Sequence, residues 1–93
     1  MKTSELKVKG GKLVKCRLEV EDGCIKSIRY IGDFFLHPEE SIERLEALLT
    51  GVKATGDKVK YIIEDFFKDS ELKLIGAAPA DFITVTLNCL EDL

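Results

Sequence analysis

The chain has 93 residues, of which 45% are hydrophobic and 33% are charged, a balance typical of a globular domain rather than a disordered segment. No apolar run approaches the roughly 20 residues that a membrane-spanning helix needs. The first ten residues also lack the apolar stretch of a secretion signal. We therefore expect a single domain over residues 1–93, a cytoplasmic location and no membrane partner.

The net charge of −3 is unevenly distributed along the chain. Residues 1–30 carry eight lysines and arginines against four acids, a net charge of +4, whereas the remainder carries six against thirteen, a net charge of −7. This asymmetry favours oriented association with a partner, and an ordinary solvated surface is the alternative. Because the chain is acidic overall and lacks an aromatic RNA-binding signature, we expect no nucleic-acid partner.

Residue types that carry catalysis are sparse. The three cysteines, Cys16, Cys24 and Cys89, form an odd set without a C-x-x-C motif, so we expect small core residues rather than disulfides or a metal site. His37 is the only histidine and stands beside Pro38, where a capping or surface role is the simplest interpretation. No glycine-rich nucleotide loop is present. The chain alone is therefore not expected to be an enzyme.

The first third predicts an antiparallel meander. Apolar and polar residues alternate over residues 5–9 and 14–21, and a third strand follows over 25–30. Gly10-Gly11 and Asp22-Gly23 supply the positive φ angles of tight hairpin turns, and a β-bulge near Lys26-Ser27 would align the third strand. The residues expected to face the core are Val14, Cys16, Leu18, Val20, Ile25, Ile28 and Tyr30.

The rest of the chain predicts mainly helices. One helix is expected to begin with Pro38 in its first turn and to end at Gly51, and a second to run from near Asp57 to Lys68–Ser70. Residues 52–56 form a connector and 72–75 a short extended piece. Residues 79–91 fit either a helix or, locally, a strand. The apolar stripes of the first two helices are Ile42, Leu45, Leu48 and Leu49, then Val59, Ile62, Ile63, Phe66 and Phe67. For 79–91 the helical face would be Phe82, Ile83, Thr86, Leu87 and Leu90.

Two loops are candidates for function. Gly10-Gly11-Lys12 can present backbone N–H groups and an ammonium to an anion, although a plain hairpin also explains it. In Gly32-Asp33-Phe34-Phe35 the aromatic rings either fill the core or contact a partner. Because the second and third strands are antiparallel, Lys12 and Asp33 should lie at the same end of the sheet. The candidate site therefore comprises Gly10, Gly11, Lys12, Asp33, Phe34 and Phe35.

These motifs occur in an order that resembles the C-terminal accessory domain of lipoate–protein ligases. The matching motifs are Gly10-Gly11-Lys12, Asp22-Gly23, Gly32-Asp33-Phe34-Phe35, Pro38-Glu39-Glu40 and, in the second half, Pro79-Ala80-Asp81-Phe82. The resemblance favours a helix over residues 79–91. It implies an α+β fold in which a three-stranded antiparallel meander packs against about three helices.

In most members of that family the domain follows a large catalytic domain, so this chain resembles the separate small subunit of a two-subunit ligase. The resemblance implies a heterodimer with a catalytic subunit that binds ATP, Mg²⁺ and lipoate, while this chain binds no cofactor by itself. The small subunit would be needed to form lipoyl-adenylate. The lipoyl-carrier domain of a 2-oxoacid dehydrogenase or glycine-cleavage system would be an indirect partner.

Two other functions fit the sequence. The chain could be a non-catalytic adaptor of another cytoplasmic complex, because similarity at the level of the fold does not determine function. It could also be a lipoyl acceptor in which Lys12 is the modified lysine, but such acceptor domains are essentially all-β, and two strong helical patterns argue against it.

Overall fold

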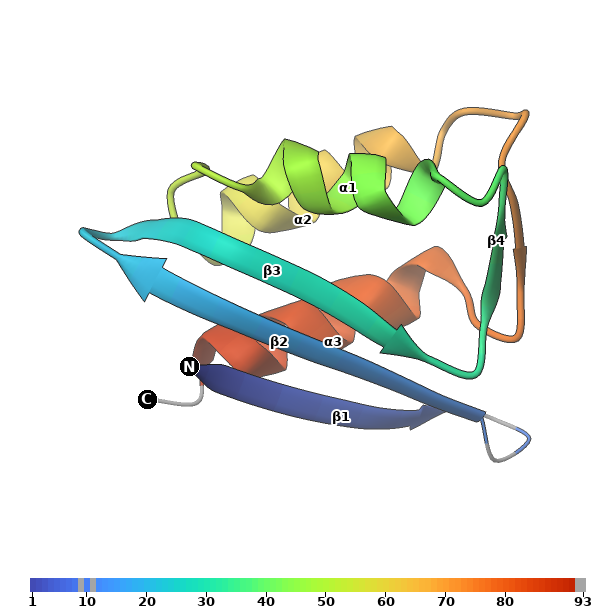
Figure 1. Cartoon of the computed structure of the whole chain (residues 1–93), viewed down its shortest axis with the longest axis horizontal. Coiled ribbons are helices and arrows are strands. Elements are labelled where there is room, and N and C mark those ends of the chain that lie inside the picture. The colour runs from blue at the N-terminus through green and yellow to red at the C-terminus, as the bar shows by residue number, and fades with distance from the viewer. Residues whose placement is uncertain (9, 11, 92–93) are drawn as a thin grey trace.

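A three-stranded antiparallel sheet, with helices on one of its faces, forms the body of the molecule (Figure 1). The structure is a computed structural model that describes residues 1–8, 10 and 12–91. The strands β1 (Lys2–Val8), β2 (Lys12–Glu21) and β3 (Cys24–Gly32) are neighbours in chain order, so the predicted meander is confirmed. None of the helices in these residues is long and apolar enough to cross a membrane.

The register within the meander agrees with the sequence pattern. Asp22 and Gly23 both have positive φ angles, of 53° and 78°, as the predicted hairpin turn requires. The pairing shifts between Glu19↔Ser27 and Val20↔Ile25, which leaves Lys26 as the extra residue of a bulge. The bulge lets Ile25, Ile28 and Tyr30 all reach the buried face, as expected. Val20 was wrongly assigned to the core, since it is exposed beside this irregularity.

Three helices complete the main body, with the bounds α1 (Ser41–Leu49), α2 (Gly56–Phe66) and α3 (Pro79–Glu91). α3 packs on β1 and β2, α1 packs on β3, and α2 contacts both other helices. The helix predicted over 79–91 is confirmed, and the second helix begins one residue before the predicted Asp57. Gly51, with a φ of +87°, directly follows the C-cap residue Thr50 and ends α1 as expected.

The start of α1 differs from the prediction. Pro38 does not occupy the first turn of the helix, because residues 38–40 form a turn and the helix begins at Ser41. The preceding residues form a strand, β4 (Phe35–His37), which pairs with β5 (Lys73–Ile75) in a second, two-stranded sheet. His37 is thus an exposed strand residue, not a helix cap. The extended piece expected at 72–75 is β5.

Aromatic rings form the centre of the core around Phe82 of α3, which is fully buried. The rings of Tyr30 and Phe34 contact it edge to face, with centroid distances of 5.2 and 5.0 Å, and the ring of Phe67 lies 5.5 Å away. The hydroxyl of Thr86 donates its single proton to the carbonyl of Phe82 at 2.6 Å. The Tyr30 hydroxyl lies 2.6 Å from the same Thr86 oxygen, so Tyr30 is the donor in that second hydrogen bond. These bonds let a threonine and a tyrosine share an apolar interior.

The connector after α1 covers the outer edge of β3. The amide of Ile25 donates to Val52 O at 2.9 Å, and the amide of Gly51 donates to Ile25 O at 2.7 Å. Further along the edge, the amide of Tyr30 donates to the Glu46 carboxylate at 2.8 Å. A segment predicted as a simple connector therefore protects a sheet edge that would otherwise offer free hydrogen-bonding groups.

Candidate functional site

The predicted site lies where the β1–β2 hairpin meets the end of β3. The amide of Asp33 donates to Leu13 O at 2.8 Å, so Asp33 and Lys12 lie at the same end of the sheet, as predicted. Gly32 permits this approach, because a Cβ at that position would lie 2.1 Å from Leu13 O. Gly10 has a φ of +94° and belongs to the same end, whereas the predicted contribution of Gly11 lies outside the described residues.

A third segment, which the sequence did not indicate, joins this end of the sheet. A Cβ at Gly76 would lie 2.7 Å from Asp33 O, so the backbone after β5 is held directly against the Gly32–Phe34 turn. The β1–β2 hairpin and the segment after β5 border an open hollow of about 500 Å³ next to this turn. It is lined by Val8, Gly10, Lys12, Gly76, Ala77, Ala78 and Asp81.

The two charged side chains of this hollow differ in their roles. The Asp81 carboxylate accepts the Ala78 amide at 2.7 Å and so stabilises the first turn of α3. The Lys12 side chain is exposed, and no carboxylate in residues 1–8, 10 and 12–91 forms an ion pair with it. The hollow therefore presents one uncommitted ammonium, which is suited to an anionic ligand or partner group.

The two phenylalanines of the predicted site have opposite environments. Phe34 is half-buried, and its ring packs edge to face on Phe82, so it contributes to the core, which is one of the two roles that the sequence left open. Phe35 is 72% exposed and pairs across the second sheet with Ile75, which is 62% exposed. Two adjacent large apolar side chains on a short sheet form a small exposed apolar patch, the kind of feature that marks interaction sites.

The Cys16 thiol and the Tyr30 hydroxyl, two groups that could act as nucleophiles, are buried outside this hollow. Burial raises the pKa of the Cys16 thiol and that of the Tyr30 hydroxyl above their ordinary values, so both stay neutral at physiological pH. Cys89 is buried beside Cys16, and its thiol contacts Cys16 O at 3.7 Å. Cys24 is half-buried. In the part of the chain that the structure describes, no three potential metal ligands come together.

Comparison with known proteins agrees with this arrangement of segments. Residues 3–85 match the family model described as the bacterial lipoate protein ligase C-terminus. The chain belongs to this family. The lipoate protein ligase C-terminus family thus accounts for both halves of the chain, including β4, β5 and most of α3, and not only for the motifs of the first half.

Two comparisons point to Thermoplasma acidophilum. The chain is 39% identical over 83 residues to lipoate-protein ligase A subunit 2, with 89% of this chain and 84% of that protein covered. It also superposes on a solved chain from an archaeal lipoylation system, a bipartite lipoate protein ligase and its E2 lipoyl domain. In that superposition the TM-score is 0.80 and the sequences are 36% identical, with 90% of this chain and 91% of the solved chain covered.

Sequence reasoning found part of the site and missed part. It placed Lys12, Asp33 and Phe35 at one end of the sheet, but it did not find Ile75, Gly76 or Asp81. The available signal was the Ile75-Gly76-Ala77-Ala78-Pro79 run, since a glycine shortly before a helix start commonly marks a sharp turn. Nothing local to that run indicates which end of the sheet it reaches.

Proposed function

We propose that this chain is the accessory subunit of a two-subunit, ATP-dependent lipoate–protein ligase. Its catalytic partner binds ATP, Mg²⁺ and lipoate, and the heterodimer activates lipoate to lipoyl-adenylate in the cytoplasm. The lipoyl group then passes to a lysine of a lipoyl-carrier domain of the 2-oxoacid dehydrogenase or glycine-cleavage type. We further propose that residues 1–93 act as one accessory domain that is not catalytic by itself.

One observation carries the proposal: the chain aligns over 84% of the length of a protein that is itself subunit 2 of a lipoate-protein ligase. The structural similarity to a chain of a bipartite ligase, over 91% of that chain, points the same way. The uncommitted Lys12 and the exposed Phe35–Ile75 pair support a role in contact with another subunit.

We assign the contact with the catalytic subunit to the end of the molecule that carries Lys12 and Phe35. Phe35 and Ile75 supply apolar area that is removed from water on association. Lys12, at the rim of the adjacent hollow, offsets negative charge of the phosphate groups during adenylation. Asp33 is a positioning residue, because its amide joins the end of β3 to Leu13 of β2. Gly10 contributes the positive φ angle of the turn between β1 and β2.

Reconstitution tests the proposed function directly. Pyrophosphate release from ATP and lipoate is measured with this chain alone, with the ligase catalytic subunit of the same genome alone, and with both. We expect turnover from the mixture and little from either protein by itself. Turnover by this chain alone, or full turnover by the catalytic subunit without it, would contradict the accessory role.

The apolar contact has a separate prediction. Phe35→Ala should weaken binding of the catalytic subunit by about thirty-fold, equivalent to about 2 kcal/mol, because a central aromatic group is lost. The free energy of unfolding should change by less than about 1 kcal/mol, since the side chain is 72% exposed. The matched control is Tyr61→Ala, which removes a 66% exposed aromatic side chain from α2. Isothermal titration calorimetry gives the dissociation constants of both variants for the catalytic subunit. Equal values for Phe35→Ala and Tyr61→Ala would show that Phe35 does not belong to the interface.

A further inference from the structure

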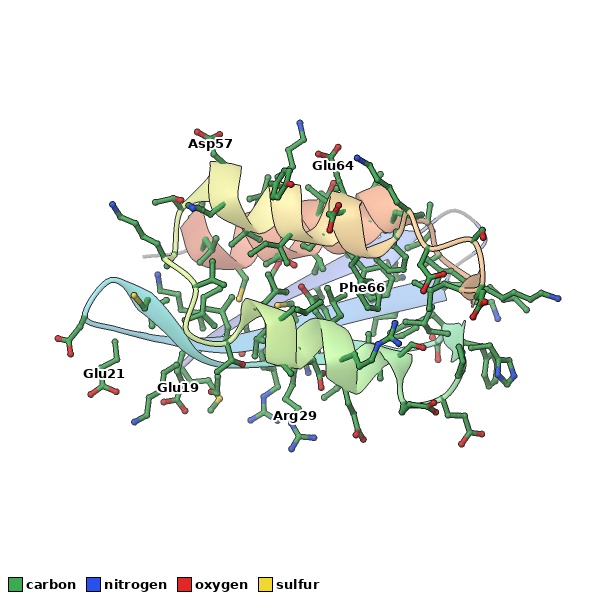
Figure 2. All side chains as sticks on the ribbon, turned by 90° about the horizontal axis from the view of Figure 1, so that it is seen from above. Glu19, Glu21, Arg29, Asp57, Glu64 and Phe66 are labelled. Carbon is green, nitrogen blue, oxygen red and sulfur yellow. The ribbon has the colours of Figure 1, made fainter. Side chains whose placement is uncertain are left out.

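The face of the main sheet that the helices leave open carries an unusual pair of charges. Arg17 of β2 and Arg29 of β3 are directly opposite each other in the register. Side chains in such positions have Cβ atoms about 5 Å apart, and like charges placed this way destabilise a sheet. Both arginines are exposed, and Figure 2 shows Arg29 directed away from the helices.

The rest of the molecule does little to offset this repulsion. Among the described residues, no carboxylate lies within 4.0 Å of either guanidinium group. Arg17 donates instead to the thioether sulfur of Met1 at 3.3 Å, and a thioether is a weak acceptor. The neighbouring pair on the same face, Glu5 and Lys15, is matched at 3.4 Å. The arginine pair therefore stands out as charge that the fold itself does not use.

The surroundings of the two arginines form a shallow receptor. They line an open hollow of about 440 Å³ together with Met1, Ser27 and Ile31. Ile31 is 49% exposed and adds a single apolar contact, and Ser27 adds a hydroxyl. Guanidinium groups match carboxylates with two parallel hydrogen bonds each, so the receptor suits a surface that presents adjacent acidic side chains.

We propose that this open sheet face, centred on Arg17 and Arg29, is a docking surface for an acidic face of the lipoyl-carrier domain. The inference rests on the proposed function, which supplies two protein partners with different requirements. The catalytic subunit remains bound, and stable interfaces of that kind are rich in apolar groups, as at Phe35 and Ile75. The carrier must arrive and leave in every cycle, which a charged, mostly polar face permits.

The position of the face separates it from the proposed subunit contact. Arg17 and Arg29 are opposite each other inside β2 and β3, whereas Lys12 is the first residue of β2, and Phe35 and Ile75 belong to the separate two-stranded sheet beyond the end of β3 (Figure 1). Nucleic acid is the less suitable occupant. Among the described residues, the open face carries no aromatic side chain on which a base could stack.

The test uses the double variant Arg17→Gln/Arg29→Gln, which removes two charges and keeps side chains of similar length. Its control, Lys58→Gln/Lys60→Gln, removes two exposed charges from α2. In the reconstituted ligase, with the lipoyl domain of the same genome as acceptor, we expect the arginine variant to raise KM for that domain about ten-fold. The value of kcat, lipoate activation and the affinity for the catalytic subunit should not change. The dependence of kcat/KM on salt should become shallower.

Direct binding separates failure of this inference from failure of the proposed function. The ¹⁵N-labelled chain is titrated with the unmodified lipoyl domain, and amide shifts confined to β2 and β3 around Arg17 and Arg29 support the docking surface whether or not the complex is active. Shifts elsewhere, or none, overturn it. So would an unchanged KM, a loss of catalytic-subunit affinity in the arginine variant alone, or tight binding of a single-stranded oligonucleotide to this face.

Discussion

At the scale of single residues, Phe34 and Phe35 show how adjacent side chains of one type are given different tasks. Successive residues of an extended chain point to opposite sides, so only one of the two rings can enter the core. Phe34 packs on Phe82, and Phe35 is 72% exposed. Sequence reasoning identified the pair and left both roles open, because the alternation alone does not show which side of this segment faces the core.

Lys12 gives the residue-scale prediction for activity. Lys12→Ala should lower lipoyl-adenylate formation by the heterodimer about ten-fold, since one positive charge near the phosphate groups is lost. The effect on activity depends on the proposed placement of Lys12 at the adenylation site. The side chain is exposed and unpaired among the described residues, so the thermal midpoint should barely move. Pyrophosphate release in the assembled complex is the measurement.

The control for Lys12 is Lys58→Ala, which removes the same charge from the first part of α2, at the opposite end of the molecule (Figure 1). Transfer from pre-made lipoyl-adenylate to the carrier should be normal in both variants. If Lys12→Ala activates lipoate at the wild-type rate, the β1–β2 hairpin has no role in activation and is only a connection between two strands. The family assignment would not be affected, because it depends on residues 3–85 as a whole.

At the scale of elements, sequence patterns within a few residues predicted the meander and the second helix correctly. The meander, its Asp22-Gly23 turn, its bulge and α2 all follow from periodicity and turn chemistry within a few residues. The start of α1 does not, because Phe35–His37 is held as a strand by pairing with Lys73–Ile75. A contact between residues almost forty positions apart has no local signature, so the proline rule placed the helix three residues too early.

The orientation of a helix was harder to predict than its presence. α3 was expected to bury Phe82, Ile83, Thr86, Leu87 and Leu90, and it buries Phe82, Val85, Thr86 and Cys89 fully. Apolar side chains surround most of this helix, so the sequence did not define one face. The hydrogen bonds of Thr86 to Phe82 O and to Tyr30 contribute to the observed orientation. In α1 one residue of the expected stripe, Leu48, is likewise not buried and is 53% exposed.

At the scale of the whole molecule, the uneven charge of the sequence becomes a difference between two sides. The helices carry acids such as Asp57 and Glu64 on the side away from the sheet, while Arg29 points out on the other side, where Glu19 and Glu21 also lie (Figure 2). The chain sequence predicted the asymmetry but not its direction in space, because that depends on which sheet face the helices cover. The helical side therefore presents acids, whereas the open sheet face presents the Arg17–Arg29 pair beside Glu19, so the two sides differ in the charges that they offer to a partner.

The whole fold should also be sensitive to alkaline pH, because two acids with raised pKa values lie in its core. Burial raises the pKa of Cys16 from 9.0 and that of Tyr30 from 10.0. Above these ordinary values the unfolded chain has lost both protons while the folded chain retains them. The unfolded state then binds fewer protons, so stability is complete below about pH 9 and falls as the pH rises further.

The slope of this loss can be predicted and assigned to its sources. When both groups are ionised only in the unfolded chain, they lower the free energy of unfolding by about 2.7 kcal/mol per pH unit. Urea unfolding between pH 8 and 11 measures the slope. Tyr30→Phe should halve this contribution, although it loses about 1 kcal/mol at every pH with the bond to Thr86. Tyr61→Phe, on an exposed side chain, should leave the slope unchanged. Parallel curves for wild type and Tyr30→Phe would show that the Tyr30 hydroxyl ionises as readily in the folded chain as in the unfolded one, which would contradict the raised pKa of Tyr30.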